Sequence, residues 1–245
     1  MRFILIRGLG RDQEHWTPLL KLMKKAFPQA LIETPDLPGA GILFQGSSPL
    51  TVDDYVPLLK EQLSSSREPA IIVGLSLGGM IALQWGAAFR EDAKSVVVIN
   101  TSSRLNFFWQ RLKFYKALRY PGVLARFNPA IKERAIYHLT CNQRPVEEEV
   151  IKQWINIQTL RPVRTENQIR QIIAAARFKL PAATSLPPVH ILYSQADHLV
   201  APSCSRKLKE FLSLESCFVH SWAGHDLPQD DPQWVVECLK RITNA

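Results

Sequence analysis

The sequence predicts an α/β protein with a doubly wound, mostly parallel sheet of about six strands and an inserted helical lid. Short apolar runs rich in β-branched residues alternate with helical patterns along the chain. The runs show no internal apolar–polar alternation, which is typical of strands buried on both faces of a parallel sheet. One interval between two runs is much longer than a crossover helix needs, which indicates an insertion.

Six apolar runs are the candidate strands. They cover residues 3–6, 30–33, 70–73, 95–99, 189–193 and 216–219. Helical spacing between the runs is clearest in one early stripe. Its members are Trp16, Leu19, Leu20, Met23 and Phe27. We expect Thr51 to cap a second helix, and Asp231-Pro232 to open the last one, because proline suits the first helical position.

The long interval lies between the fourth and fifth runs and spans about 90 residues. Its helical patterns are punctuated by Pro121-Gly122, Asn128-Pro129, Pro145 and Pro162. We therefore predict a core made of residues 1–103 and 185–245, with residues 104–184 as an inserted helical lid.

Charge is distributed unevenly along the chain of 245 residues. The net charge is +8, but residues 104–179 carry +10 and the remainder carries −2. The basic character therefore belongs to the predicted lid, and the slightly acidic remainder argues against nucleic-acid binding. No apolar run reaches the roughly 18 residues that span a bilayer. Because the first residues read as a strand rather than a signal peptide, we expect a cytoplasmic protein.

Four cysteines are present, and no two form a CxxC pair. They are Cys141, Cys204, Cys217 and Cys238. This usage predicts free thiols in a reducing compartment. His138 and Cys141 could share a helix face, but no second ligand pair lies nearby, so we expect no metal and no organic cofactor.

The segment Gly74-Leu75-Ser76-Leu77-Gly78 is the strongest candidate for chemistry. A strand pattern enters it and a helical pattern follows it. A sharp strand-to-helix turn forces the serine into strained backbone geometry, and the flanking glycines allow close packing. The turn would expose the Ser76 hydroxyl at the carboxyl end of the sheet, beside a helix N-terminus that favours developing negative charge.

A serine hydroxyl needs a base, and the base needs a carboxylate that orients it. His225 lies on a loop after the last candidate strand, and Asp197 leaves the carboxyl end of the preceding one. We predict that Ser76, Asp197 and His225 form a triad. Asp226 is the alternative acid, but we expect it to be solvated, and we expect Asp36 to form a turn.

The other histidines fit the role of the base less well. His15 and His138 lie in helical patterns, His190 and His220 lie in or at the end of strands, and His198 adjoins the candidate acid. An oxyanion hole needs two backbone N–H donors. We expect them from Leu77, which follows the serine, and from Leu9 in the loop after the first strand.

Several motifs together resemble the α/β-hydrolase superfamily. They are Arg7-Gly8-Leu9-Gly10, Asp36-Leu37-Pro38-Gly39-Ala40-Gly41, Gly74-Leu75-Ser76-Leu77-Gly78-Gly79, Asp197-His198-Leu199-Val200 and Gly224-His225. The resemblance is to the small-molecule esterase branch that includes the pimeloyl-[acyl-carrier protein] methyl ester esterases. It covers the core and implies the same triad, in the order Ser76, Asp197, His225, with Leu9 and Leu77 as donors that touch the substrate.

Two departures from the family pattern stand out. Arg7-Gly8 replaces the usual His-Gly after the first core strand, and the usual N-terminal antiparallel hairpin is missing. The family histidine is mostly structural, so we expect the oxyanion hole to be kept. Neither departure involves the triad.

Aromatic and basic residues interleave at the start of the predicted lid, in residues 104–120. Three interpretations compete: an amphipathic helix with its aromatic side chains packed down, a docking surface for an acidic carrier such as acyl carrier protein or coenzyme A, and contact with an anionic membrane surface. Phe107, Phe108 and Arg161 are the candidate substrate contacts of the lid.

The residues thus predict a hydrolase that cleaves a small-molecule carboxylic ester or thioester through an acyl-enzyme. Carbon–carbon bond hydrolysis and perhydrolase activity use the same triad and remain open. The alternatives are action on a substrate linked to acyl carrier protein or coenzyme A, and a non-catalytic ligand-binding protein that kept the fold.

Overall fold

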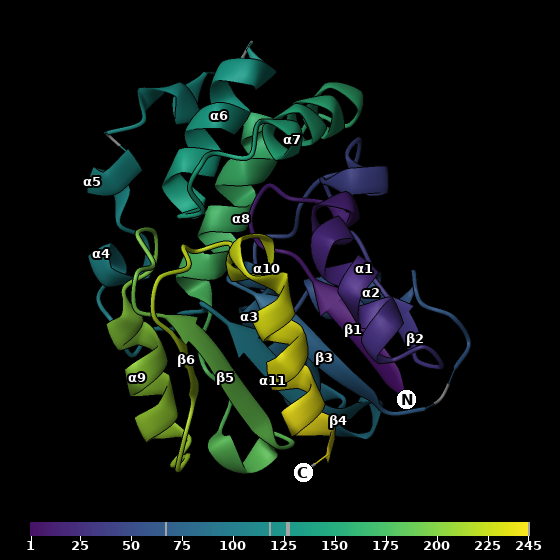
Figure 1. Ribbon diagram of the computed structural model, residues 1–245. Helices are drawn as coiled ribbons and strands as arrows, with labels where there is room; N and C mark the ends of the chain where they lie inside the picture. Colours follow the sequence, from purple (N-terminus) through teal and green to yellow (C-terminus); the bar gives the residue numbers. More distant parts are fainter. Residues whose placement is uncertain (67, 118, 126–127, 245) are drawn as a thin grey trace.

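A six-stranded parallel sheet forms the centre of the molecule (Figure 1). The computed structural model describes residues 1–66, 68–117, 119–125 and 128–244. Along the sheet the strands follow the order β2-β1-β3-β4-β5-β6, and all neighbours are parallel. Their bounds are β1 Arg2–Ile6, β2 Leu31–Glu33, β3 Ala70–Leu75, β4 Ala93–Ile99, β5 Val189–Ser194 and β6 Phe218–His220. All six predicted strands are confirmed, with small shifts at their ends.

Alternate residues of the central strands enter two apolar clusters, one on each face of the sheet. Ile4 and Ile72 belong to one cluster, and Phe3 and Ile71 to the other. This double burial explains why the strands read as continuous apolar runs. Helices α1 (Thr17–Ala26) and α11 (Pro232–Asn244) cover one face, whereas α2 (Tyr55–Lys60), α3 (Leu77–Ala88) and α9 (Pro202–Phe211) cover the other. The predicted doubly wound architecture is confirmed.

Short helical segments complete the core. They are η1 Gln13–Trp16, η2 Gly41–Leu43, η3 Arg90–Asp92, η5 Ala183–Ser185 and α10 Leu227–Asp230. The predicted start of α11 is confirmed, because the Asp231 carboxylate accepts a hydrogen bond from the Trp234 N–H at 2.9 Å. The expectation for Thr51 is wrong. Helix α2 begins only at Tyr55, and the Thr51 hydroxyl donates to the Asp54 carboxylate at 2.5 Å instead.

Between β4 and β5 the chain forms a further group of helices, which we call the inserted segment (residues 104–184). Its helices are α4 Phe108–Arg111, α5 Phe114–Ala117, η4 Pro121–Leu124, α6 Pro129–Thr140, α7 Glu148–Leu160 and α8 Thr165–Arg177. Figure 1 shows α6 and α7 beyond one end of the sheet. An apolar cluster of their own joins these two helices, with Tyr137 and Trp154 among its members. The division into core and lid remains a prediction.

The start of the inserted segment departs from the amphipathic helix that was one of its interpretations. Two of the aromatic side chains there, Phe107 and Trp109, are each 63% exposed and stack with ring centroids 4.7 Å apart. The cationic Arg111 is buried instead, and its guanidinium donates to the carbonyl oxygens of Ala175 and Ala176 in α8. Because helix α4 has only four residues, helical spacing does not control which side chains face the core.

All four cysteines are free thiols, as predicted. Three of them are buried, and among these Cys141 directly follows helix α6. In the described ranges, none of the helices has both the length and the apolar character needed to cross a membrane.

Candidate active site

Ser76 occupies the turn between β3 and α3, with the unusual backbone angles φ 57° and ψ −115°. Such a conformation costs on the order of 1–3 kcal/mol and persists only where the surroundings hold it. Here the Ser76 N–H donates to the Ile99 carbonyl at 2.9 Å, and the Ser76 carbonyl accepts from the Thr101 hydroxyl at 2.7 Å. The strained strand-to-helix turn expected from the sequence is therefore present.

The glycines on either side of Ser76 are required by close backbone packing. A Cβ on Gly78 would lie 2.1 Å from the Ile6 carbonyl oxygen, and one on Gly74 would lie 2.1 Å from the Gly78 carbonyl oxygen. No side chain fits at either position. This packing brings the end of β1 against the N-terminus of α3, and so places the loop after β1 beside the serine.

His225 and Asp197 form a buried hydrogen-bonded pair. The His225 Nδ1 and Asp197 Oδ2 atoms are 2.8 Å apart, and both residues are at least nine-tenths buried. The second carboxylate oxygen of Asp197 accepts from the Leu199 and Val200 N–H groups at 2.7 and 2.9 Å. These two bonds fix the carboxylate, so that it can orient the imidazole and stabilise its charged form.

Asn100 holds the His225 loop and was not singled out by the sequence. It adopts a positive φ of 46° directly after β4. Its side-chain amide donates to the Gly224 and His225 carbonyls, and its side-chain oxygen accepts from the Ser194 N–H. One side chain thus joins the loop of the histidine to the strand that leads to Asp197. An asparagine after a buried strand, where a positive φ is tolerated, is the only signal the sequence offers.

Arg7 and Asp226 form a second buried pair behind the histidine. Two guanidinium nitrogens contact the two carboxylate oxygens at 3.2 and 2.6 Å, and the guanidinium lies over the Trp16 ring. Burial opposes ionisation of Asp226, but the Arg7 charge and hydrogen bonds outweigh it and hold the pKa of that carboxyl below its ordinary value. The expectation of a solvated Asp226 is wrong. Arg7, which stands where the family usually has histidine, thus has a structural role of its own: it links the β1 loop to the His225 loop.

The loop after β1 lies against the serine. A Cβ added to Gly8 would come within 3.3 Å of the Ser76 Cβ and 3.9 Å of its hydroxyl oxygen. Leu9 and Leu77 line the same cavity as Ser76, and Leu77 is the first residue of α3. The N–H groups in the first turn of a helix have no acceptor within the helix, which leaves the Leu77 N–H available to a ligand.

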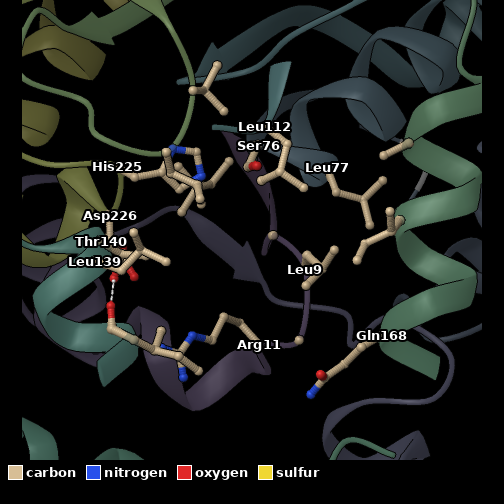
Figure 2. A pocket seen from close by; sticks show the side chains of 18 of the residues that line it. Leu9, Arg11, Ser76, Leu77, Leu112, Leu139, Thr140, Gln168, His225 and Asp226 are labelled. Carbon is tan, nitrogen blue, oxygen red and sulfur yellow. Dashed lines mark hydrogen bonds between the residues drawn. The ribbon is translucent and has the colours of Figure 1, made fainter. Parts of the chain in front are cut away.

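A cavity of about 310 Å³ opens at these residues. Figure 2 shows the Ser76 hydroxyl and the His225 ring on its wall, with Leu9 and Leu77 close by. The inserted segment supplies the opposite wall, and most of its contribution is apolar. Representative lining residues there are Leu112, Ile136, Leu139, Ile172 and Ala175. The volume suits a small organic molecule.

The three candidate lid contacts have different surroundings. Phe108 lines the cavity, but Phe107 and Arg161 do not. The Arg161 guanidinium is bound to the Asp12 and Glu14 carboxylates of the core, so it is a tether between the inserted segment and the core. Contact of Phe107 and Arg161 with a substrate therefore stays a prediction that the lining of this cavity does not support.

The remaining carboxyl considered from the sequence, Asp36, directly precedes a turn in which the Ala40 N–H donates to the Leu37 carbonyl at 2.9 Å. It accepts hydrogen bonds from the Gln13 and Ile42 N–H groups at 2.7 and 2.9 Å. Burial raises its pKa to about 6. In the described residues, no group of three or more His, Cys, Asp and Glu side chains is placed to hold a metal ion.

Comparison with known proteins places this geometry in a family. The model of the alpha/beta hydrolase family matches residues 3–238. The pimeloyl-[acyl-carrier protein] methyl ester esterase of Aliivibrio salmonicida is 23% identical over 233 residues, which cover 91% of this chain and 84% of the relative. The biotin biosynthesis bifunctional protein of Cellvibrio japonicus is 22% identical over 97% of this chain, which spans 46% of that longer protein.

A solved structure shows the same fold. The enol-lactonase from Burkholderia xenovorans superposes with a TM-score of 0.75 at 16% sequence identity, over 100% of this chain and 91% of the lactonase. Identity this low supports the fold alone, so the chemistry has to be argued from the site.

Proposed function

Because this chain belongs to the alpha/beta hydrolase family and is an enzyme of the hydrolase type, we propose that it cleaves a carboxylic ester or thioester through Ser76, Asp197 and His225. One observation carries the proposal. A strained serine and a histidine held 2.8 Å from a buried carboxylate face one largely apolar cavity. This combination supplies a nucleophile, a base and an apolar pocket beside them.

In the proposed reaction, the Ser76 hydroxyl oxygen attacks the substrate carbonyl carbon while His225 Nε2 takes the hydroxyl proton. The carbonyl oxygen becomes an oxyanion that accepts hydrogen bonds from the Leu9 and Leu77 N–H groups. The bond to the leaving alcohol or thiol then breaks, and the histidine returns the proton to that group. Water, activated by the same histidine, hydrolyses the acyl-enzyme and restores the serine.

Labelling with a fluorophosphonate probe tests this proposal, because the probe phosphonylates an activated serine. We expect wild-type protein to be labelled, and we expect Ser76→Ala and His225→Gln to remain unlabelled although they fold. A non-catalytic ligand-binding protein would bind without labelling, so failure of the wild-type chain to react would refute the enzyme mechanism.

A second candidate concerns the leaving group. We propose that the start of the inserted segment docks an acidic carrier, such as acyl carrier protein or coenzyme A. The exposed aromatic side chains of Phe107 and Trp109 share the sequence stretch 104–119 with the cations Arg104, Lys116 and Arg119. They flank residues that line the cavity, and the relative from A. salmonicida is named for a carrier-linked substrate. Such a surface suits an acidic partner.

Charge reversal separates this candidate from a small-ester hydrolase. Changing Arg104, Lys116 and Arg119 together to Glu should raise KM for a carrier-linked ester and leave KM for a small nitrophenyl ester unchanged. The control is reversal of three exposed lysines on helix α1, Lys21, Lys24 and Lys25. Equal effects on both substrates would refute carrier docking. If the unmodified protein binds anionic vesicles more tightly than the charge-reversed variant does, membrane contact would be favoured instead.

Cytoplasmic location remains a prediction.

A further inference from the structure

The loop that carries the proposed Leu9 donor is a tight turn of residues 8–11. The Gly8 carbonyl accepts from the Arg11 N–H at 3.4 Å, and Gly10 at the third position has φ 69°, as a type II turn requires. The Gly8 carbonyl and the Leu9 N–H belong to one peptide group. The orientation of that peptide plane, and so the direction of the donor, is therefore set by whatever holds Gly10 and Arg11.

Three helices of the inserted segment hold these two residues. The Gly10 N–H donates to Gln171 Oε1 of α8 at 2.8 Å, and the Gly10 carbonyl accepts from Gln158 Nε2 of α7 at 3.5 Å. The Arg11 guanidinium donates to Glu133 Oε2 of α6 at 2.5 Å. The Gly10 N–H, the Gly10 carbonyl and the Arg11 guanidinium are thus each bound by a side chain more than 100 residues away in sequence.

The three side chains of the inserted segment that make these contacts are buried, which makes the contacts costly to break. Gln171 and Glu133 have no exposed surface, and Gln158 is 5% exposed. Gln171 is itself fixed, because its amide nitrogen donates to the Ser48 hydroxyl at 3.2 Å. A buried polar group that loses its partner costs about 1–3 kcal/mol, so the turn and the helices favour a single relative arrangement.

We propose that Gln171, supported by Gln158 and Glu133, is a positioning residue that aims the Leu9 N–H at the reacting carbonyl oxygen. The proposal rests on the function proposed above. It assigns the inserted segment a part in the chemistry as well as in covering the cavity. The oxyanion donor is correctly placed only while α6, α7 and α8 are seated on the loop.

The test compares two isosteric substitutions on helix α8. Gln171→Met removes the acceptor for Gly10. Asn167→Leu removes a buried amide one turn earlier, which bonds to Gly39, Gly46 and Ser48 but does not contact the turn of residues 8–11. Both weaken the attachment of α8, but only the first frees the oxyanion loop. Steady-state kinetics with a nitrophenyl ester and the affinity for a trifluoromethyl ketone, which forms an oxyanion on the serine, are measured for each.

We expect Gln171→Met to lower kcat about tenfold with KM nearly unchanged, because complete removal of a donor costs 10²–10³ in kcat and displacement costs less. Its affinity for the ketone should fall by the same factor. Asn167→Leu should lower the melting temperature and keep kcat. If Gln171→Met fails to fold, Gln158→Met should show a smaller loss of the same kind, because its bond to Gly10 is longer.

Two results would overturn the proposal: wild-type kcat in a folded Gln171→Met protein, or an equal loss of kcat in Asn167→Leu. Failure of the proposed function itself looks different, because wild-type protein would then neither react with the fluorophosphonate probe nor turn over the ester.

Discussion

The two sides of the cavity are built in different ways. On the sheet side, Ser76, Asp197 and His225 each follow a strand. They are held by the Ile99 carbonyl of β4, by the N–H groups of Leu199 and Val200, and by the Asn100 side chain, respectively. On the side of the inserted segment, the walls come from short helices attached to the core by individual buried side-chain contacts, such as that of Glu133 with Arg11. The residues of the first side stand in turns and loops at strand ends, whereas the second side is attached through side-chain pairs that are far apart in sequence. Substitutions on the two sides should therefore differ in how they change activity and stability.

The largest effect is expected on the sheet side, from Asp197→Asn. The amide cannot stabilise the charged imidazole or enforce its tautomer, so kcat should fall about 10⁴-fold while the fold is kept. Steady-state kinetics and the melting temperature measure the two effects separately. A loss of less than tenfold would show that another carboxylate orients His225.

Arg7→Met tests the junction between the β1 loop and the His225 loop. The substitution leaves the Asp226 charge buried without its cation, and we expect a loss of about 3–5 kcal/mol in the free energy of unfolding. Urea denaturation measures this loss. The double variant Arg7→Met/Asp226→Leu should recover most of the stability.

A matched surface pair serves as the control for Arg7→Met. Lys152 is exposed and binds Glu149 on the outer face of α7, so Lys152→Met should leave the urea midpoint unchanged. If Arg7→Met also left the urea midpoint unchanged, the Arg7–Asp226 pair would not be what holds the two loops together.

Asp36 offers a smaller effect and an unusual pH dependence. Burial raises its folded-state pKa to about 6, above the ordinary value of 3.8, so the folded chain binds the proton more tightly than the unfolded chain. Its contribution to stability is thus full below about pH 4 and is lost as the pH rises through about 6, by about 3 kcal/mol. Subtracting the stability curve of Asp36→Asn from that of wild type isolates this loss. A flat difference between pH 4 and 6 would contradict it.

The smallest effect is expected from the aromatic residues of the inserted segment. Phe108 lines the cavity and the adjacent Phe107 does not. Phe108→Ala should change KM a few-fold for esters with long acyl chains, because part of an apolar wall is removed. Phe107→Ala is the matched control and should leave the chain-length preference unchanged. Equal effects of the two substitutions would mean that both side chains reach the substrate.

The same contrast explains what the sequence could predict. The strands, the turn at Ser76 and the loops of Asp197 and His225 depend on local patterns, so residue types and their order were sufficient. Asn100, the Arg7–Asp226 pair and the Gln171 contact depend on side chains brought together from distant segments, which periodicity does not reveal. The ion pairs of Arg161 were not foreseen for the same reason, since its partners Asp12 and Glu14 lie about 150 residues away.

The thiol of Cys141 can be used to measure how firmly the inserted segment is attached to the core. The residue follows α6 and is buried, and a Cβ added to Gly224 of the His225 loop would lie 3.1 Å from its Cα. Burial raises the pKa of the Cys141 thiol, which further suppresses its thiolate. An alkylating reagent can therefore react with this buried sulfur only when the packing around α6 opens. The rate of alkylation at Cys141 should therefore report how often this part of the inserted segment opens. A bound ligand that holds the inserted segment on the core should slow the reaction.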